Sequence, residues 1–167
     1  IYTTGDCQMV FIDTPGIHKP KTKLGNFMTD SALNTFKEVD LVLFLVDDSL
    51  SQGPGDKYIV EMLKNINTPK FLVINKMDKI NPEDYEKIYN EYEQTGIFDE
   101  IFPVSALEQK NIDILLESIE KFMPEGPQYF PSDMITDHPE RFIVSEILRE
   151  KVLMFLEDEV PHGVAIE

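Results

Sequence analysis

The chain has 167 residues, 42% of them hydrophobic, and a formal net charge of −16 at neutral pH. Its length and composition fit one globular core, or one domain with a small appendage. The negative charge argues against this stretch gripping nucleic acid by itself, because phosphate binding needs clustered Lys and Arg side chains. A single cysteine, Cys7, excludes an internal disulfide framework.

Apolar runs and helical periodicities alternate along the first 123 residues. Strands are expected at residues 8–12, 41–46, 70–74 and 100–104, and helices at 26–37, 56–65, 82–94 and 112–122. The 41–46 run is continuously apolar, which predicts a fully buried strand. Asn81 and Asn111 are predicted to cap the last two helices. This strand–helix order predicts an α/β fold, with a mostly parallel sheet and right-handed crossovers.

A segment rich in Pro and Gly follows this region and predicts a linker at 124–132. Beyond it, a long helix is expected at 139–158 and the beginning of a strand at 161–167. This helix and strand are too small to form a domain. We therefore expect residues 133–167 to begin a second domain, and the chain to be part of a longer protein.

Asp13-Thr14-Pro15-Gly16 directly follows the first long strand. Strand-end acids in phosphate-handling enzymes reach Mg²⁺, often through water, so Asp13 is a candidate metal residue. Gly16 would let its backbone N–H approach a phosphate with no side chain in the way. The alternative is an ordinary turn, because Asp, Pro and Gly are the common turn residues.

Asn75-Lys76-Met77-Asp78 follows the 70–74 strand, where ligands bind in open α/β sheets. The Asp78 carboxylate offers two acceptor oxygens, which match the adjacent ring N–H and amino group of guanine. Lys76 would lay its apolar stem over the base, and Asn75 would tie loops together. The alternative is a polar loop between a strand and a helix.

Ser105-Ala106-Leu107 follows the next strand, and Ala106 could donate its backbone N–H to the guanine carbonyl. Together the three motifs resemble the G3, G4 and G5 boxes of the translation-factor-like P-loop GTPases, over about residues 1–123. The resemblance implies a partial G domain, a three-layer sandwich with helices on both faces of the sheet. It also implies Mg²⁺ with GTP or GDP, bound by Asp13, Thr14, Pro15, Gly16, Ile17, Asn75, Lys76, Met77, Asp78, Ser105, Ala106 and Leu107.

The tail resembles the junction of Era-type GTPases, where the G domain meets a C-terminal RNA-binding KH domain. The likeness rests on Tyr129-Phe130-Pro131, on Ile135-Thr136-Asp137 and on residues 145–151. It implies a monomeric cytoplasmic GTPase that couples its nucleotide state to ribosomal RNA binding during small-subunit maturation. Loose association with the inner face of the cell membrane is a further implication.

The sequence contains no phosphate-binding Gly-x-x-x-x-Gly-Lys-Ser/Thr loop, which the resemblance places upstream of residue 1 together with switch I. We expect the chain alone to be inactive and to bind GTP poorly. Ile17 stands where Ras-like enzymes place the Gln that orients water, so the catalytic residues are unknown. His18 is adjacent, but a single His in a loop is usually a solvated side chain.

Two alternatives stay open at the level of sequence. One is an RNA-binding assembly module with a vestigial nucleotide site. The other is a GTPase of the same class with a different C-terminal domain. An intact upstream phosphate loop would favour the enzyme, and a Gly-x-x-Gly sequence beyond residue 167 would favour the Era type.

Overall fold

The computed structural model describes residues 1–14 and 35–155. The chain divides into two compact units, and each is described by itself. One consists of Ile1–Phe11 together with Gln128–Glu167, and the other is Ile12–Pro127. Residues 1–11 thus group with the C-terminal segment, whereas the sequence assigned them to the first domain.

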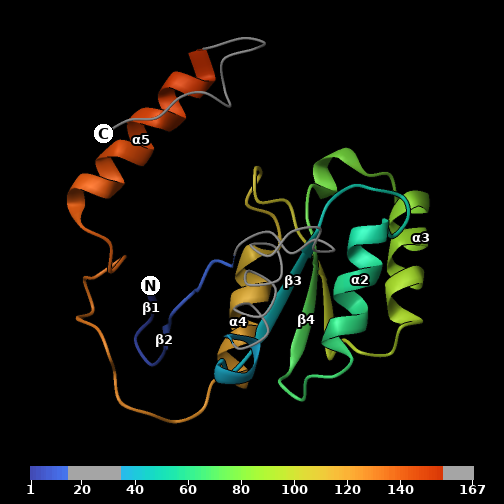
Figure 1. Cartoon of the computed structure of the whole chain (residues 1–167), viewed down its shortest axis with the longest axis horizontal. Helices are drawn as coiled ribbons and strands as arrows, with labels where there is room; N and C mark the ends of the chain where they lie inside the picture. Colours follow the sequence, from blue (N-terminus) through green and yellow to red (C-terminus); the bar gives the residue numbers. More distant parts are fainter. Residues whose placement is uncertain (15–34, 156–167) are drawn as a thin grey trace, which may run out of the picture. The chain divides into compact units, whose positions relative to one another are not determined.

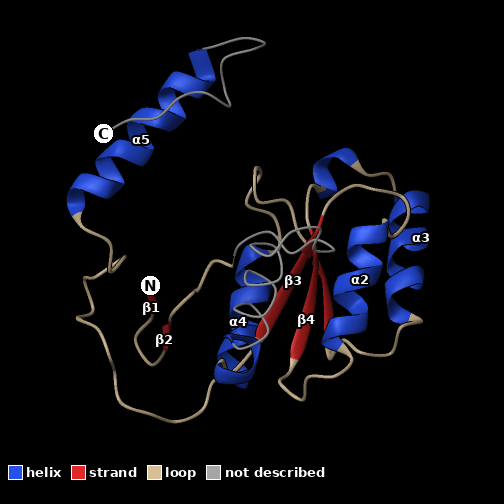
Figure 2. Cartoon of the chain, in the orientation of Figure 1, coloured by secondary structure: helices blue, strands red, loops and turns tan. Residues whose placement is uncertain are grey.

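The larger unit is built on a parallel sheet in the order β3 (Val42–Val46), β4 (Lys70–Ile74) and β5 (Glu100–Pro103). These strands confirm the expected parallel α/β arrangement (Figure 2). In the register, Val46 lies beside Ile74, and Ile74 lies beside Pro103. The loops that follow the three strands therefore begin side by side at one edge of the sheet.

Helices cover both faces of this sheet (Figure 1). The helices α2 (Pro54–Leu63) and α3 (Pro82–Glu93) lie on one side, and α4 (Ile112–Phe122) lies on the other. Side chains alternate along β4, so Leu72 faces the α2 and α3 layer while Phe71 contacts Phe122 of α4. The buried core of the first layer comprises Phe36, Val42, Phe44, Val60, Leu63, Ile66, Leu72, Ile74, Ile88 and Tyr92.

The helix starts show which capping signals were decisive. Asn81 caps α3 as predicted, because its Oδ1 accepts the backbone N–H of Asp84 at 2.9 Å. Asn111 occupies the N-cap position of α4, as predicted, but its side chain makes no capping hydrogen bond. Its backbone is left-handed, with φ of 59°, and its Nδ2 donates to the Pro103 carbonyl at 2.8 Å.

Two expectations about burial and strand length are also corrected. The strand expected at 8–12 is only β2 (Gln8–Met9), which pairs antiparallel with β1 (Tyr2–Thr3). Residues 10–12 are exposed and have no strand partner among the described residues. Leu45 in β3 is 60% exposed, so β3 is not fully buried. Within the described chain, β3 is an edge strand, and Leu45 points away from the α2 and α3 layer.

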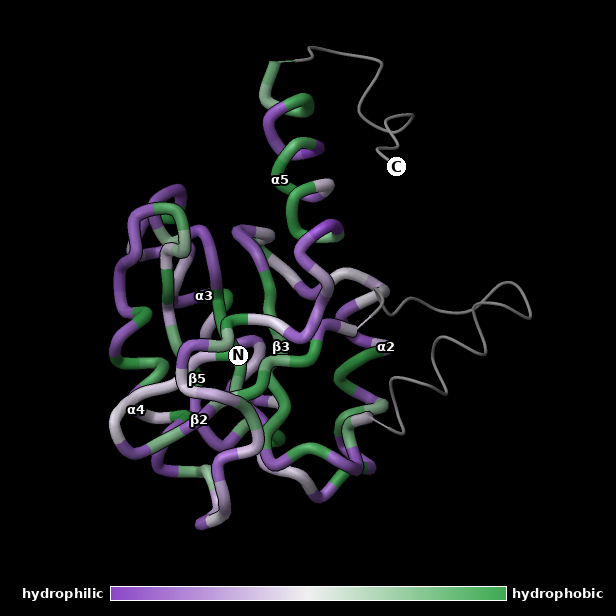
Figure 3. Tube along the Cα trace, turned by 90° about the vertical axis from the view of Figure 1, so that its left-hand side faces the viewer, coloured by the Kyte–Doolittle hydropathy of each residue, from purple (hydrophilic) through white to green (hydrophobic). Residues whose placement is uncertain are grey.

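In the smaller unit, the side chain of Gln8 links the β1–β2 hairpin to residues 128–130. Gln8 Nε2 donates to the Phe130 carbonyl at 2.9 Å, and its Oε1 accepts the N–H groups of Tyr129 and Phe130 at 3.1 and 2.9 Å. The helix α5 (Glu140–Phe155) confirms the predicted 139–158 helix over its described part. Apolar residues recur along α5 (Figure 3), but none of its residues is buried.

Several predicted features fall on residues outside the described ranges. These are most of the 26–37 helix, of which only residues 35–37 are described and helical, and the whole 161–167 strand. Across residues 1–14 and 35–155, none of the helices has the length and apolarity that a bilayer crossing requires.

Candidate functional site

Two of the three predicted motifs meet at the carboxyl edge of the sheet. Residues 75–78 leave the end of β4, and residues 105–107 follow β5. The Met77 N–H donates to the Val104 carbonyl at 3.1 Å, and the Ser105 hydroxyl donates to Asp78 Oδ1 at 2.5 Å. The structure therefore brings the second and third motifs into direct hydrogen-bond contact.

Asp78 is held by a residue that has no exposed surface itself. Ser105 is 0% exposed, and its Oγ also accepts the Glu108 N–H at 3.2 Å. The hydrogen bond from Ser105 is the main reason that the pKa of Asp78 is lowered, although partial desolvation opposes it. Asp78 is therefore a fixed anion at neutral pH. Such a carboxylate can accept further hydrogen bonds from a ligand with two adjacent donors.

Asn75 joins the ends of all three strands. Its backbone N–H donates to the Val46 carbonyl at 2.8 Å, and its Oδ1 accepts the N–H groups of Lys76 and Ala106 at 2.8 and 3.0 Å. Asn75 thus ties the loops together, as the sequence predicted. The Ala106 N–H, expected to reach a guanine carbonyl, donates to Asn75 here. A contact with a base would have to share or replace that bond.

Lys76 has an unusual backbone conformation and two acidic neighbours. Its φ and ψ are 64° and 34°, in the left-handed region that few residues other than Gly adopt. Its Nζ lies 3.6 Å from Asp47 Oδ2 and 3.8 Å from Asp48 Oδ1. Sequence patterns alone could not predict this contact, because the loops after β3 and β4 come together only when the two strands pair.

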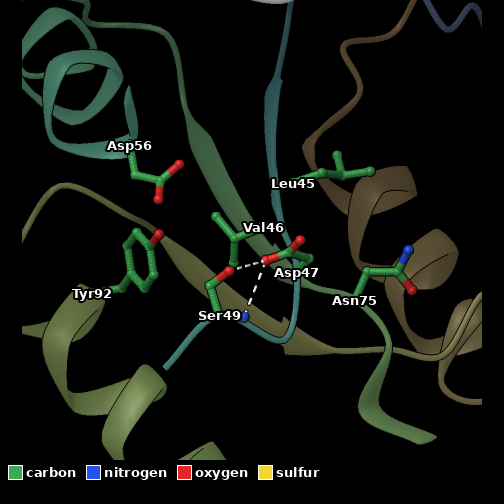
Figure 4. A pocket seen from close by; sticks show the side chains of 7 residues that line it. All are labelled: Leu45, Val46, Asp47, Ser49, Asp56, Asn75 and Tyr92. Carbon is green, nitrogen blue, oxygen red and sulfur yellow. Dashed lines mark hydrogen bonds between the residues drawn. The ribbon is translucent and has the colours of Figure 1, made fainter. Parts of the chain in front are cut away.

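A cleft of about 430 Å³ opens at the same edge, beside the loop that follows β3 (Figure 4). It is lined by Leu45, Val46, Asp47, Ser49, Asp56, Asn75 and Tyr92. The far end of this loop is anchored to α3, because the Gln52 N–H lies 3.2 Å from both carboxylate oxygens of Glu91. Burial raises the pKa of Tyr92, so its hydroxyl stays protonated. The sequence pattern did not predict that Asp56 and Tyr92 would lie at this edge of the sheet.

The first motif is described only in part. Asp13 is exposed and Thr14 is half-buried, whereas Pro15, Gly16, Ile17 and His18 lie outside the described residues. A carboxylate such as that of Asp13 is a hard oxygen donor that fits Mg²⁺, an ion that keeps several of its waters in nucleotide sites. Leu107, at the end of the third motif, is 83% exposed. The nucleotide roles of these residues stay predictions.

Comparison with known proteins decides the family. Residues 1–125 match the family described as Elongation factor Tu GTP binding domain. The chain belongs to this family of GTP-binding domains. The match covers both motifs of the site, so the contact between Asp78 and Ser105 lies within a GTP-binding fold.

Within this family, the chain is similar to Era-type GTPases. The chain is 58% identical to GTPase Era of Alkaliphilus metalliredigens and 54% identical to GTPase Era of Clostridioides difficile. Each alignment covers 100% of the chain and 57% of the relative, so the chain spans a little over half of their length. These matches confirm the Era-type resemblance.

A solved structure agrees with this family. The structure of Era in complex with MgGDPNP and a segment of 16S ribosomal RNA superposes with a TM-score of 0.75 at 40% identity. The alignment covers 90% of the chain and 52% of that protein. It confirms the G-domain fold.

Proposed function

We propose that the full-length protein binds GTP and GDP with Mg²⁺ and hydrolyses GTP, as an Era-type GTPase. The observation that carries this proposal is the Asp78 carboxylate, fixed by Ser105 at the end of a parallel strand. Guanine presents two adjacent donors to such a group, whereas adenine does not. The similarity to GTPase Era relatives supports the same function.

The residues of the site would divide the work of binding. Asp78 accepts hydrogen bonds from the ring N–H and amino group of guanine, and the apolar stem of Lys76 covers the face of the base. Asn75 holds the three loops together. Asp13 would hold Mg²⁺ through water, and the ion would neutralise charge on the phosphate groups. Because Ile17 is apolar, other groups must orient the attacking water.

We also propose that nucleotide state is coupled to ribosomal RNA binding during small-subunit maturation. The Era structure with a 16S ribosomal RNA segment supports this proposal. The net charge of −16 implies that a part of the protein outside this chain would bind the RNA. A KH domain that continues from α5, a monomeric state, a cytoplasmic location and loose membrane association belong to the same proposal.

GTP turnover by the purified full-length protein tests the activity. We expect phosphate release from GTP in the presence of Mg²⁺, loss of release when EDTA removes the metal, and no release from ATP. Equal turnover of GTP and ATP would contradict base reading by Asp78. If the protein bound RNA but neither GTP nor GDP, it would be an RNA-binding module with a vestigial nucleotide site and not a GTPase.

A further inference from the structure

The left-handed backbone of Lys76 aims its side chain toward the end of the neighbouring strand. Residues other than Gly adopt this conformation at a cost, and it persists where the surroundings determine it. Here the surroundings are two hydrogen bonds of Asn75, from its N–H to Val46 and from the Lys76 N–H to its Oδ1. The direction of the Lys76 side chain is therefore set by the sheet and by Asn75.

The two carboxylates that meet the ammonium group come from the loop after β3. Asp47 and Asp48 follow that strand directly, and the distances to Lys76 Nζ are 3.6 and 3.8 Å. The Lys76 and Asp47 side chains are 45% and 50% exposed, so each ion pair by itself is weak. Both carboxylates attract the same ammonium group, so their effects on the position of the Lys76 side chain add.

Asp47 uses its two oxygens for different partners. Its Oδ1 accepts the N–H and hydroxyl of Ser49 at 3.1 and 2.7 Å (Figure 4). Its Oδ2 is left to face Lys76 Nζ. The hydrogen bonds from Ser49 are also the main cause of the lowered pKa of Asp47. The Asp47 carboxylate is therefore negatively charged at neutral pH, and Ser49 fixes its orientation.

We infer that Asp47 and Asp48 are positioning residues for the proposed guanine-binding site of residues 75–78 and 105–107. They hold the Lys76 ammonium at the end of β3, so that the apolar stem of Lys76 stays across the face of the base. This inference rests on the proposed binding of guanine nucleotides. The ammonium is then engaged by protein carboxylates, and the contribution of Lys76 to binding comes from its stem. Without Lys76, the same two acids would only repel the phosphates of a nucleotide.

A double-mutant cycle in the full-length protein tests this inference. GDP dissociation constants are measured for the wild type, the Asp47→Asn/Asp48→Asn variant, Lys76→Met, and all three changes together. With Lys76 present, we expect the two Asn substitutions to weaken GDP binding by roughly two- to fivefold, the range for exposed ion pairs. In the Lys76→Met background they should leave binding unchanged or strengthen it, because only the repulsion of phosphates is removed.

The control variant is Glu117→Gln/Glu125→Gln, which removes two negative charges from exposed side chains on α4 and after it. It should bind GDP as the wild type does. The coupling between the acids and Lys76 should also shrink at high salt, since exposed charges are screened. An equal change of affinity in both Lys76 backgrounds, or tighter GDP binding of the Asn variant with Lys76 present, would overturn the inference. A wild type that binds no GDP would instead refute the proposed function.

Discussion

Asp78→Asn is expected to weaken GDP binding by the full-length protein roughly 10²- to 10⁴-fold. The substitution replaces an anion that accepts two hydrogen bonds from guanine by an amide that can accept only one of them. Hydrogen bonds to a charged group contribute about 1.5–3 kcal/mol each. The variant loses one of them, leaves that guanine donor unpaired, and weakens the other by removing the charge, which together account for the expected loss. Calorimetric titration with GDP measures it.

The same variant should gain affinity for a different base. Xanthine carries a carbonyl where guanine has its amino group, so the amide that Asp78→Asn introduces can donate to it. The variant keeps an oxygen that can accept the Ser105 hydroxyl, and its thermal unfolding should stay close to that of the wild type. Glu117→Gln serves as a control for loss of one exposed charge. GDP affinity of Asp78→Asn within about threefold of the wild type would show that Asp78 does not read the base.

Phe71→Ala is expected to lower the free energy of unfolding by about 3–5 kcal/mol, as large-to-small core substitutions do. Phe71 is 0% exposed, and its ring centroid lies 5.2 Å from that of Phe102 and 4.9 Å from that of Phe122. The substitution would leave a cavity between β4, β5 and α4. Urea denaturation, read as a change in midpoint at constant slope, measures the loss.

Leu107→Ala is the matched control for this prediction. Leu107 is 83% exposed, so removing its side chain should change the free energy of unfolding by less than about 0.5 kcal/mol. A loss below about 1 kcal/mol for Phe71→Ala would contradict the packing of α4 against β4.

The sequence predicted the elements whose signals are local. β4 has the predicted bounds, because residues 71–74 are continuously apolar and a polar motif follows them. The start of α3 was predicted from Asn81 and Pro82, since an N-cap acts within one turn of the helix. Asn111 shows the limit of such signals: its side chain bonds to β5 instead of the helix N-terminus.

Features that depend on neighbouring elements could not be predicted. Apolar runs alone do not reveal strand order, so the exposure of Leu45 and the lack of a strand partner for residues 10–12 among the described residues were missed. The contact of Lys76 with Asp47 requires that β3 and β4 be adjacent and in register. The site motifs were found because each follows a strand, whereas the contact that fixes Asp78 appeared only when β4 and β5 were paired.

Competition between three nucleotides tests the central claim most directly, namely that residues 75–78 and 105–107 form a guanine-reading site. The full-length protein is titrated with GDP, with IDP, whose base keeps the ring N–H but lacks the amino group, and with ADP. We expect GDP to bind most tightly, IDP roughly 10- to 10²-fold more weakly because it loses one hydrogen bond to a charged acceptor, and ADP most weakly. ADP binding within a few fold of GDP would contradict the claim.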